Sequence, residues 1–71
     1  MVPTSRRLIR NIRYFVVTQN WTYMALAEKL GVCHQTIGAW ASGSRNPTFY
    51  HVDRLADAFG VDPVELFKER R

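Results

Sequence analysis

Apolar residues recur along this chain at intervals of three and four, which is the period of a helix with one buried face. The first such run predicts a helix over residues 5–18, capped by Thr4 or Ser5 and ended by Gln19-Asn20. Its apolar stripe consists of Leu8, Ile9, Ile12, Phe15 and Val16. Three arginines, Arg6, Arg10 and Arg13, fall on another face of the same helix.

Two short helices are expected next, separated by about three residues. Thr22 is a good N-cap for the first, over residues 23–30, and Gly31 follows it where a left-handed backbone is needed. The second is expected over residues 34–42, with Cys33 as a poor N-cap. A helix, a turn of about three residues and another helix is the spacing typical of a DNA-binding helix-turn-helix.

Two further helices complete the prediction. Thr48 is the expected N-cap of a fourth helix, which ends at Gly60. The sequence Asp62-Pro63-Val64-Glu65 is a strong start signal for a short last helix, anchored by Leu66 and Phe67. The apolar residues of the run after Thr48 are Phe49, Val52, Leu55, Ala56 and Phe59. No strand-like alternation is evident, so the predicted fold class is all-α, a compact five-helix domain over residues 1–71.

Helical spacing also favours a core role for the large aromatic residues over stacking on single-stranded bases. These residues are Phe15, Trp21, Trp40, Phe49, Phe59 and Phe67.

Composition excludes several classes of protein. With 71 residues, 46% of them hydrophobic and 23% charged, the chain fits one folded domain. A single cysteine allows no internal disulfide, and Cys33, His34 and His51 do not have zinc-site spacing, so neither metal nor cofactor is expected. Apolar runs are far shorter than the roughly 20 residues of a membrane span, and residues 1–7 lack a signal-peptide core. A cytoplasmic, nucleoid-associated protein is therefore expected.

The distribution of charge indicates a polyanionic partner. The net charge is +4 and the isoelectric point about 9.8. Residues 1–47 contain six basic residues and one acidic residue, whereas residues 48–71 contain four basic and five acidic ones. A polyanion such as DNA would thus meet the first two thirds of the chain.

Residues 22–47, TYMALAEKLGVCHQTIGAWASGSRNP, resemble the core of the Cro and phage-repressor helix-turn-helix family, and the resemblance extends over about residues 8–67. It implies a lambda-repressor-like fold whose helix 34–42 enters the major groove of double-stranded DNA while helix 23–30 crosses the backbone. The matching elements are Leu26-Ala27, Leu30-Gly31-Val32, Thr36-Ile37, Trp40, Gly43, Asn46-Pro47, Leu55-Ala56, Ala58-Phe59-Gly60-Val61 and Glu65-Leu66.

The resemblance also assigns candidate roles to residues. Gln35 is the first choice for base reading, because a glutamine amide can pair bidentately with adenine. The base-reading set is His34, Gln35, Thr36, Gly38 and Ala39. The phosphate-contacting set is Thr22, Tyr23, Cys33, Ser42, Ser44, Arg45 and Asn46. A possible backbone-contacting arm is Arg6, Arg7, Arg10 and Arg13.

Four positions depart from the family pattern. Many relatives carry long polar residues where this chain has Gly38 and Ala39. Either Gly38 lets the helix sit deep in the groove while Ala39 meets a thymine methyl group, or these positions contribute little specificity. Val16 and Ala41 stand where relatives often have an arginine–glutamate pair, and an apolar pair can replace it without loss of stability.

The expected protein is a phage Cro-type repressor that occludes a promoter, needs no cofactor and forms a weak homodimer on its operator. Any dimer would use the last two helices, near Tyr50, Gly60, Val61, Pro63 and Val64. Two alternatives stay open: a helix-turn-helix module that binds protein, and a DNA-binding antitoxin or regulator outside phages. No enzyme is expected, because there is no glycine-rich phosphate loop and no arrangement of paired carboxylates, and the adjacent Cys33 and His34 would point in different directions.

Overall fold

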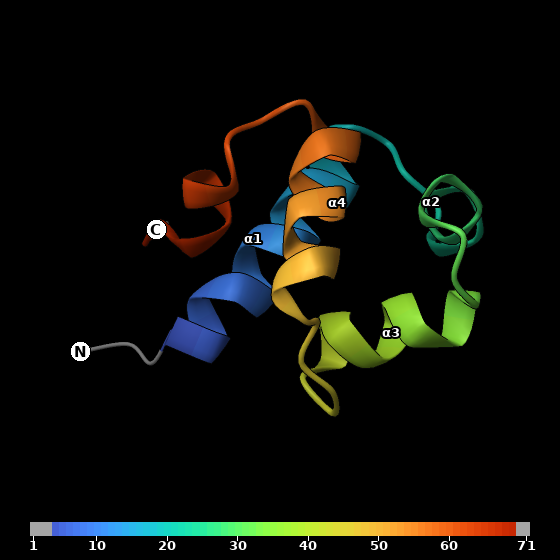
Figure 1. Cartoon of the computed structure of the whole chain (residues 1–71), viewed down its shortest axis with the longest axis horizontal. Helices are drawn as coiled ribbons and strands as arrows, with labels where there is room; N and C mark the ends of the chain where they lie inside the picture. Colours follow the sequence, from blue (N-terminus) through green and yellow to red (C-terminus); the bar gives the residue numbers. More distant parts are fainter. Residues whose placement is uncertain (1–3, 70–71) are drawn as a thin grey trace.

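In the computed structural model, which describes residues 4–69, four α-helices are followed by one short 3₁₀ helix (Figure 1). The elements are α1 (Thr4–Thr18), α2 (Tyr23–Leu30), α3 (His34–Ser42), α4 (Phe49–Phe59) and η1 (Pro63–Phe67). No strand occurs in this described part of the chain. The all-helical prediction is confirmed, and the helices after Thr22, Cys33 and Thr48 begin where their caps predict.

The prediction of a fifth α-helix is wrong, because residues Pro63–Phe67 form a 3₁₀ helix. Asp62 caps the segment as expected, its carboxylate accepting a hydrogen bond from the Val64 N–H at 3.2 Å. The turn closes by a Glu65 N–H to Asp62 carbonyl bond, the i→i+3 pattern of a 3₁₀ helix, and the chain is extended again at Lys68. Two carbonyl groups at its end bond to a side chain of α1, so the segment ends after five residues.

That side chain belongs to Asn11, which is completely buried between α1 and η1. Its Nδ2 donates to the carbonyl oxygens of Leu66, at 2.8 Å, and Lys68, at 2.7 Å. A buried carbonyl without a partner would be destabilising, so this amide both fastens η1 to α1 and satisfies the end of the turn.

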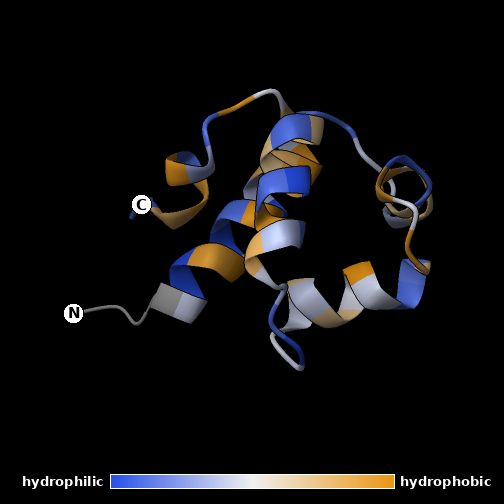
Figure 2. Ribbon diagram, viewed as in Figure 1, coloured by the Kyte–Doolittle hydropathy of each residue, from blue (hydrophilic) through white to orange (hydrophobic). Residues whose placement is uncertain are grey.

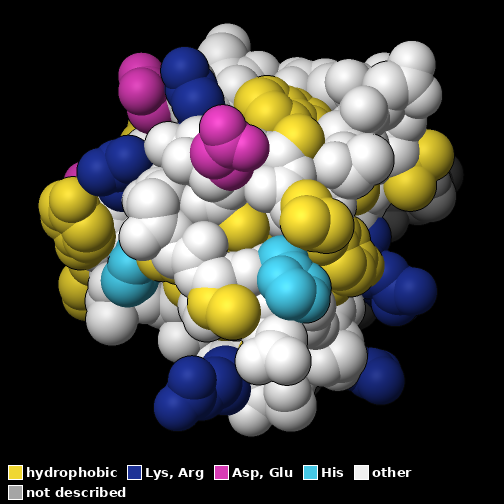
Figure 3. Space-filling view, turned by 90° about the vertical axis from the view of Figure 1, so that its right-hand side faces the viewer, with side chains coloured by type: hydrophobic (Ala, Val, Ile, Leu, Met, Phe, Trp, Pro, Cys, Tyr) yellow, Lys and Arg dark blue, Asp and Glu magenta, His cyan; other side chains and the backbone are white. Residues whose placement is uncertain are grey.

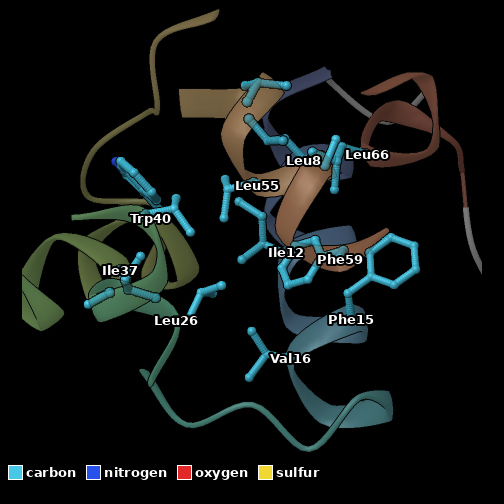
Figure 4. Packing of buried hydrophobic residues seen from close by; sticks show 14 residues of the cluster. Leu8, Ile12, Phe15, Val16, Leu26, Ile37, Trp40, Leu55, Phe59 and Leu66 are labelled. Atoms are coloured by element: carbon cyan, nitrogen blue, oxygen red, sulfur yellow. The ribbon is translucent and has the colours of Figure 1, made fainter. Parts of the chain in front are cut away.

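The core lies where the helices meet (Figure 4). Ile12, Leu26, Ile37, Leu55 and Leu66, one from each element, are almost inaccessible to solvent. Figure 2 shows the corresponding alternation of hydrophobic and hydrophilic residues along the ribbons of α1 and α4. The remaining core residues are Leu8, Phe15, Val16, Ala27, Leu30, Trp40, Val52, Ala56 and Phe59, with Trp21, Val32, Ala58, Val61 and Phe67 packed against them.

Among the aromatic residues expected in the core, the prediction for Phe49 is wrong. It is the first residue of α4 and its side chain is 87% exposed. The helical spacing before Val52 is correct, but the first turn of α4 extends beyond the packed part of the helix. Val16 and Ala41, the expected apolar replacement of an ion pair, are both buried.

Candidate nucleic-acid interface

Helices α2 and α3 are joined by a tight turn over Gly31, Val32 and Cys33 (Figure 1). Gly31 has φ +73°, a left-handed conformation in which an L side chain would be strained. The Val32 N–H bonds back to the Ala27 carbonyl at 3.0 Å, which closes the end of α2. This geometry turns the chain sharply enough for α3 to pack against α1 and α2 within three residues.

One face of α3 is buried and the other faces solvent. Ile37, Trp40 and Ala41 point into the core, so the opposite face is left free. Of the residues predicted to read bases, His34 and Gln35 are exposed in the first turn of α3. Thr36, Gly38 and Ala39, also in that predicted set, are half-buried. The hydrogen-bonding side chains on this face are therefore concentrated at the N-terminal end of α3.

The N-cap position of α3 adds a weak contact to Gln35. The Cys33 side chain caps no backbone N–H, as the sequence predicts for cysteine. Its Sγ instead lies 3.9 Å from Oε1 of Gln35, to which it donates a weak hydrogen bond. Both side chains are exposed, so Gln35 can leave this contact for a stronger partner at little cost.

The structure brings together Tyr23 and Gly38, which sequence reasoning had placed in separate sets. A Cβ atom built on Gly38 would lie 4.0 Å from both Cδ2 and Cε2 of the Tyr23 ring. The ring, 40% exposed, therefore lies beside the glycine, where the start of α2 meets the middle of α3.

Apart from Cys33, which lies beside Gln35, the residues predicted to contact phosphate lie at the two ends of this surface. Thr22 is the N-cap of α2, and its hydroxyl accepts a hydrogen bond from the Ala25 N–H at 3.0 Å. At the other end, the Ser42 and Ser44 hydroxyls lie 3.3 Å apart and both donate to the Ala39 carbonyl. These two hydroxyl groups thus stabilise the end of α3. Exposed Arg45 and Asn46 follow in the loop.

Basic side chains gather around the same surface. Figure 3 shows them along its lower and right-hand edges without acidic neighbours, whereas acidic and basic side chains lie side by side at the upper left. Arg6, Arg10 and Arg13 are exposed on α1. Arg7 is half-buried, and within residues 4–69 its buried Nε has no hydrogen-bond partner. The predicted arginine arm is thus part of a regular helix.

The residues predicted to form a dimer interface lie on α4 and the segment after it. Tyr50 and Val64 are 62% and 61% exposed, and Gly60 and Pro63 are exposed as well. Val61 is half-buried and packs against the core instead.

Arg54 makes contacts in this region that were not expected from the sequence. Its guanidinium donates to the Tyr50 hydroxyl at 3.0 Å and to the carbonyls of Lys29 and Leu30 at 3.3 and 3.4 Å. Arg54 therefore joins α4 to the C-terminal end of α2, where carbonyl groups lack partners within the helix. An unpaired basic residue on an otherwise amphipathic helix gave only a weak hint of this contact.

Other chemistries find no support in the described residues. Within residues 4–69 there is no group of three histidine, cysteine, aspartate or glutamate side chains that could hold a metal ion. No helix in that part of the chain is long and apolar enough to cross a membrane.

Comparison with known proteins gives two matches. Residues 12–66 match the family described as helix-turn-helix. An uncharacterized HTH-type transcriptional regulator of Methanocaldococcus jannaschii is 36% identical over 56 residues, which cover 79% of this chain and 85% of the relative. No solved structure matches the chain significantly.

Proposed function

The chain belongs to the helix-turn-helix family, and on that premise we propose that it is a transcriptional regulator that binds double-stranded DNA with α3 in the major groove. One observation carries the proposal. The exposed face of α3 presents His34 and Gln35 at its N-terminal end, while its opposite face is anchored in the core by Ile37 and Trp40. A helix held in this way fits a groove about 12 Å wide.

Gln35 is the proposed principal base-reading residue. Its amide can accept from N6 and donate to N7 of adenine, a bidentate contact that distinguishes adenine from the other bases. His34, beside it, would donate to a guanine or to a phosphate group. Thr36 is half-buried, so its role is limited to a contact through the exposed part of its side chain.

Phosphate groups would be held at both ends of the reading surface. In this orientation the start of α2, with Thr22 and Tyr23, would face one of the two DNA strands that border the groove. Arg45, Asn46 and the two serines at the end of α3 would face the other strand, and Arg45 is the one among them that carries a full charge. Contacts of this kind fix the register on DNA and add little sequence preference.

We also propose that the protein acts as a weak homodimer assembled on DNA, through the exposed residues Tyr50, Gly60, Pro63 and Val64. Such a dimer would read two half-sites about 34–36 Å apart. Bound over a promoter, it would exclude polymerase in the manner of a phage Cro repressor.

Selection of binding sites from a random duplex pool tests the proposal, followed by titration of the winning and a scrambled duplex at several salt concentrations. We expect a two-fold symmetric site and a steep loss of affinity with salt. Absence of binding at low salt would refute DNA recognition and favour a protein-binding module. Binding without enrichment would refute sequence-specific regulation.

Two variants separate base reading from phosphate contact. Gln35→Ala should cost about 1–3 kcal/mol at one base pair and relax specificity there. Arg45→Ala should weaken binding to all sequences alike and reduce the salt slope by about one unit. Equal losses of Gln35→Ala on selected and scrambled DNA would contradict the role assigned to Gln35.

A further inference from the structure

We propose that a depression where α3, the loop after it and the start of α4 meet binds one phosphate group of the DNA backbone, with His51 as a hydrogen-bond donor (Figure 1). The inference rests on the proposed function, because it requires α3 to lie in the major groove. It adds a binding residue from α4, whereas the phosphate contacts proposed above come from α2, the end of α3 and the loop. This α3–α4 depression has a volume of about 370 Å³ and is lined by Thr36, Trp40, Arg45, Asn46, Pro47, Thr48 and His51.

The lining of the α3–α4 depression suits an anion. Most of its residues have hydrogen-bonding side chains, and none of them is acidic. Arg45 carries a full positive charge and is exposed, so its guanidinium is available to a ligand in the depression. Thr36 belongs to α3, so the depression adjoins the helix proposed to lie in the groove. The anions that border the major groove are the backbone phosphates, so one of them has both the chemistry and the position that this lining requires.

Three neighbours hold the His51 ring in a defined position. Its centroid lies 5.1 Å from that of the buried Trp40 ring and 5.4 Å from that of the Tyr50 ring. Its Nδ1 lies 2.9 Å from the Thr48 hydroxyl oxygen, which is hydrogen-bond distance. A side chain that is already ordered loses little conformational entropy when it binds a ligand, so this arrangement favours binding.

The contact to Thr48 determines which ring nitrogen of His51 is left for a ligand. The Thr48 oxygen already accepts a hydrogen bond from the backbone N–H of His51 at 3.3 Å, and its own proton is free to be donated to Nδ1. With that bond formed, the proton of a neutral imidazole is on Nε2, and in the imidazolium both nitrogens carry one. A phosphate oxygen only accepts, so it selects these two states, in which Nε2 is a donor. Within residues 4–69 Nε2 has no hydrogen-bond partner and is not buried, so it is available to such an oxygen.

Neutralisation of single phosphates tests the inference. In the selected duplex each phosphate of one half-site is replaced in turn by methylphosphonate, and the loss of affinity at each position is measured. The measurement is repeated with His51→Phe, which keeps a ring beside Trp40 but has no N–H to donate. At one position the loss should be about ten-fold smaller for this variant than for the unmodified protein, because a hydrogen bond to a charged group contributes about that factor. At the other positions the losses should not change.

Further variants separate the α3–α4 depression from the rest of the interface. His51→Ala should reduce the loss at the same phosphate, and Arg45→Ala should reduce it there as well, because both side chains line the depression. His34→Ala is the matched control, because it removes an imidazole that does not line the depression and should leave the loss at this phosphate unchanged. An undiminished loss in either His51 variant, or an effect of Arg45→Ala only at another phosphate, would overturn the inference while leaving the proposed function intact. Failure to select any duplex would instead refute the proposed function.

Discussion

Gly38→Ala should stabilise the protein, although glycine occupies the middle of α3, the proposed recognition helix. Residue 38 lies within α3, where glycine is less favourable than alanine by about 1 kcal/mol. The new Cβ would meet no atom closer than 4.0 Å, so no steric cost offsets this gain. For a domain of this size, about 1 kcal/mol corresponds to an increase in Tm of roughly 4–8 °C.

Thermal unfolding followed by circular dichroism at 222 nm measures this change, with urea unfolding as a second measure of the free energy. Gly60→Ala is the matched control, because it adds the same methyl group where nothing lies within 4 Å but φ is +73°. A left-handed backbone costs an L residue about 1–2 kcal/mol, so the control should be destabilised. The two variants should therefore move Tm in opposite directions.

A lower Tm for Gly38→Ala would refute the reasoning, since it would mean that Tyr23 approaches Gly38 too closely for a side chain.

Three further changes test the packing. Asn11→Ala should lower the free energy of unfolding in urea by about 1–3 kcal/mol, because two carbonyl groups of the last turn lose their donor. A change below about 0.5 kcal/mol would show that these two hydrogen bonds do not hold η1 against α1. Phe49→Ser should change the free energy of unfolding by no more than about 0.5 kcal/mol, because the Phe49 side chain is exposed. Phe59→Ala should lower it by about 3–5 kcal/mol in the same assay, because Phe59 is buried. Similar losses in both variants would place Phe49 in the core. Gly43→Ala should lower Tm by about as much as the control glycine variant does, because φ is +85° at Gly43 and the atom nearest to its Cβ, Cδ1 of Ile9 at 2.8 Å, is the end of a flexible side chain that can move away. A much larger loss of Tm would contradict this reasoning.

Sequence periodicity predicted the helical elements well because it reports burial directly. The stripe from Leu8 to Val16 and the caps at Thr22 and Thr48 involve residues within one or two turns of each other, so local chemistry determines them. Phe49 and the last turn were mispredicted for a related reason. Whether the first residue of a helix is covered, or a capped turn continues, depends on what lies opposite in space, and periodicity contains no such information.

The candidate interface was predictable as a set of positions but not as a surface. The resemblance to phage repressors placed Tyr23 among phosphate contacts and Gly38 among base contacts, 15 positions apart in the chain. That the ring of one borders the vacant side of the other follows only from the angle between α2 and α3. The pattern could therefore not predict that these two residues lie side by side.

The angle between α2 and α3 itself depends on polar contacts that hydrophobic patterns do not encode. Arg54 holds the carbonyls at the end of α2 against α4, and Gly31 turns the chain directly afterwards into α3. A shift of α2 relative to α4 would move the Tyr23 ring away from Gly38 without removing any residue from the surface. Arg54 and Gly31 thus affect the shape of the candidate interface from outside it, because they determine where the Tyr23 ring lies relative to α3.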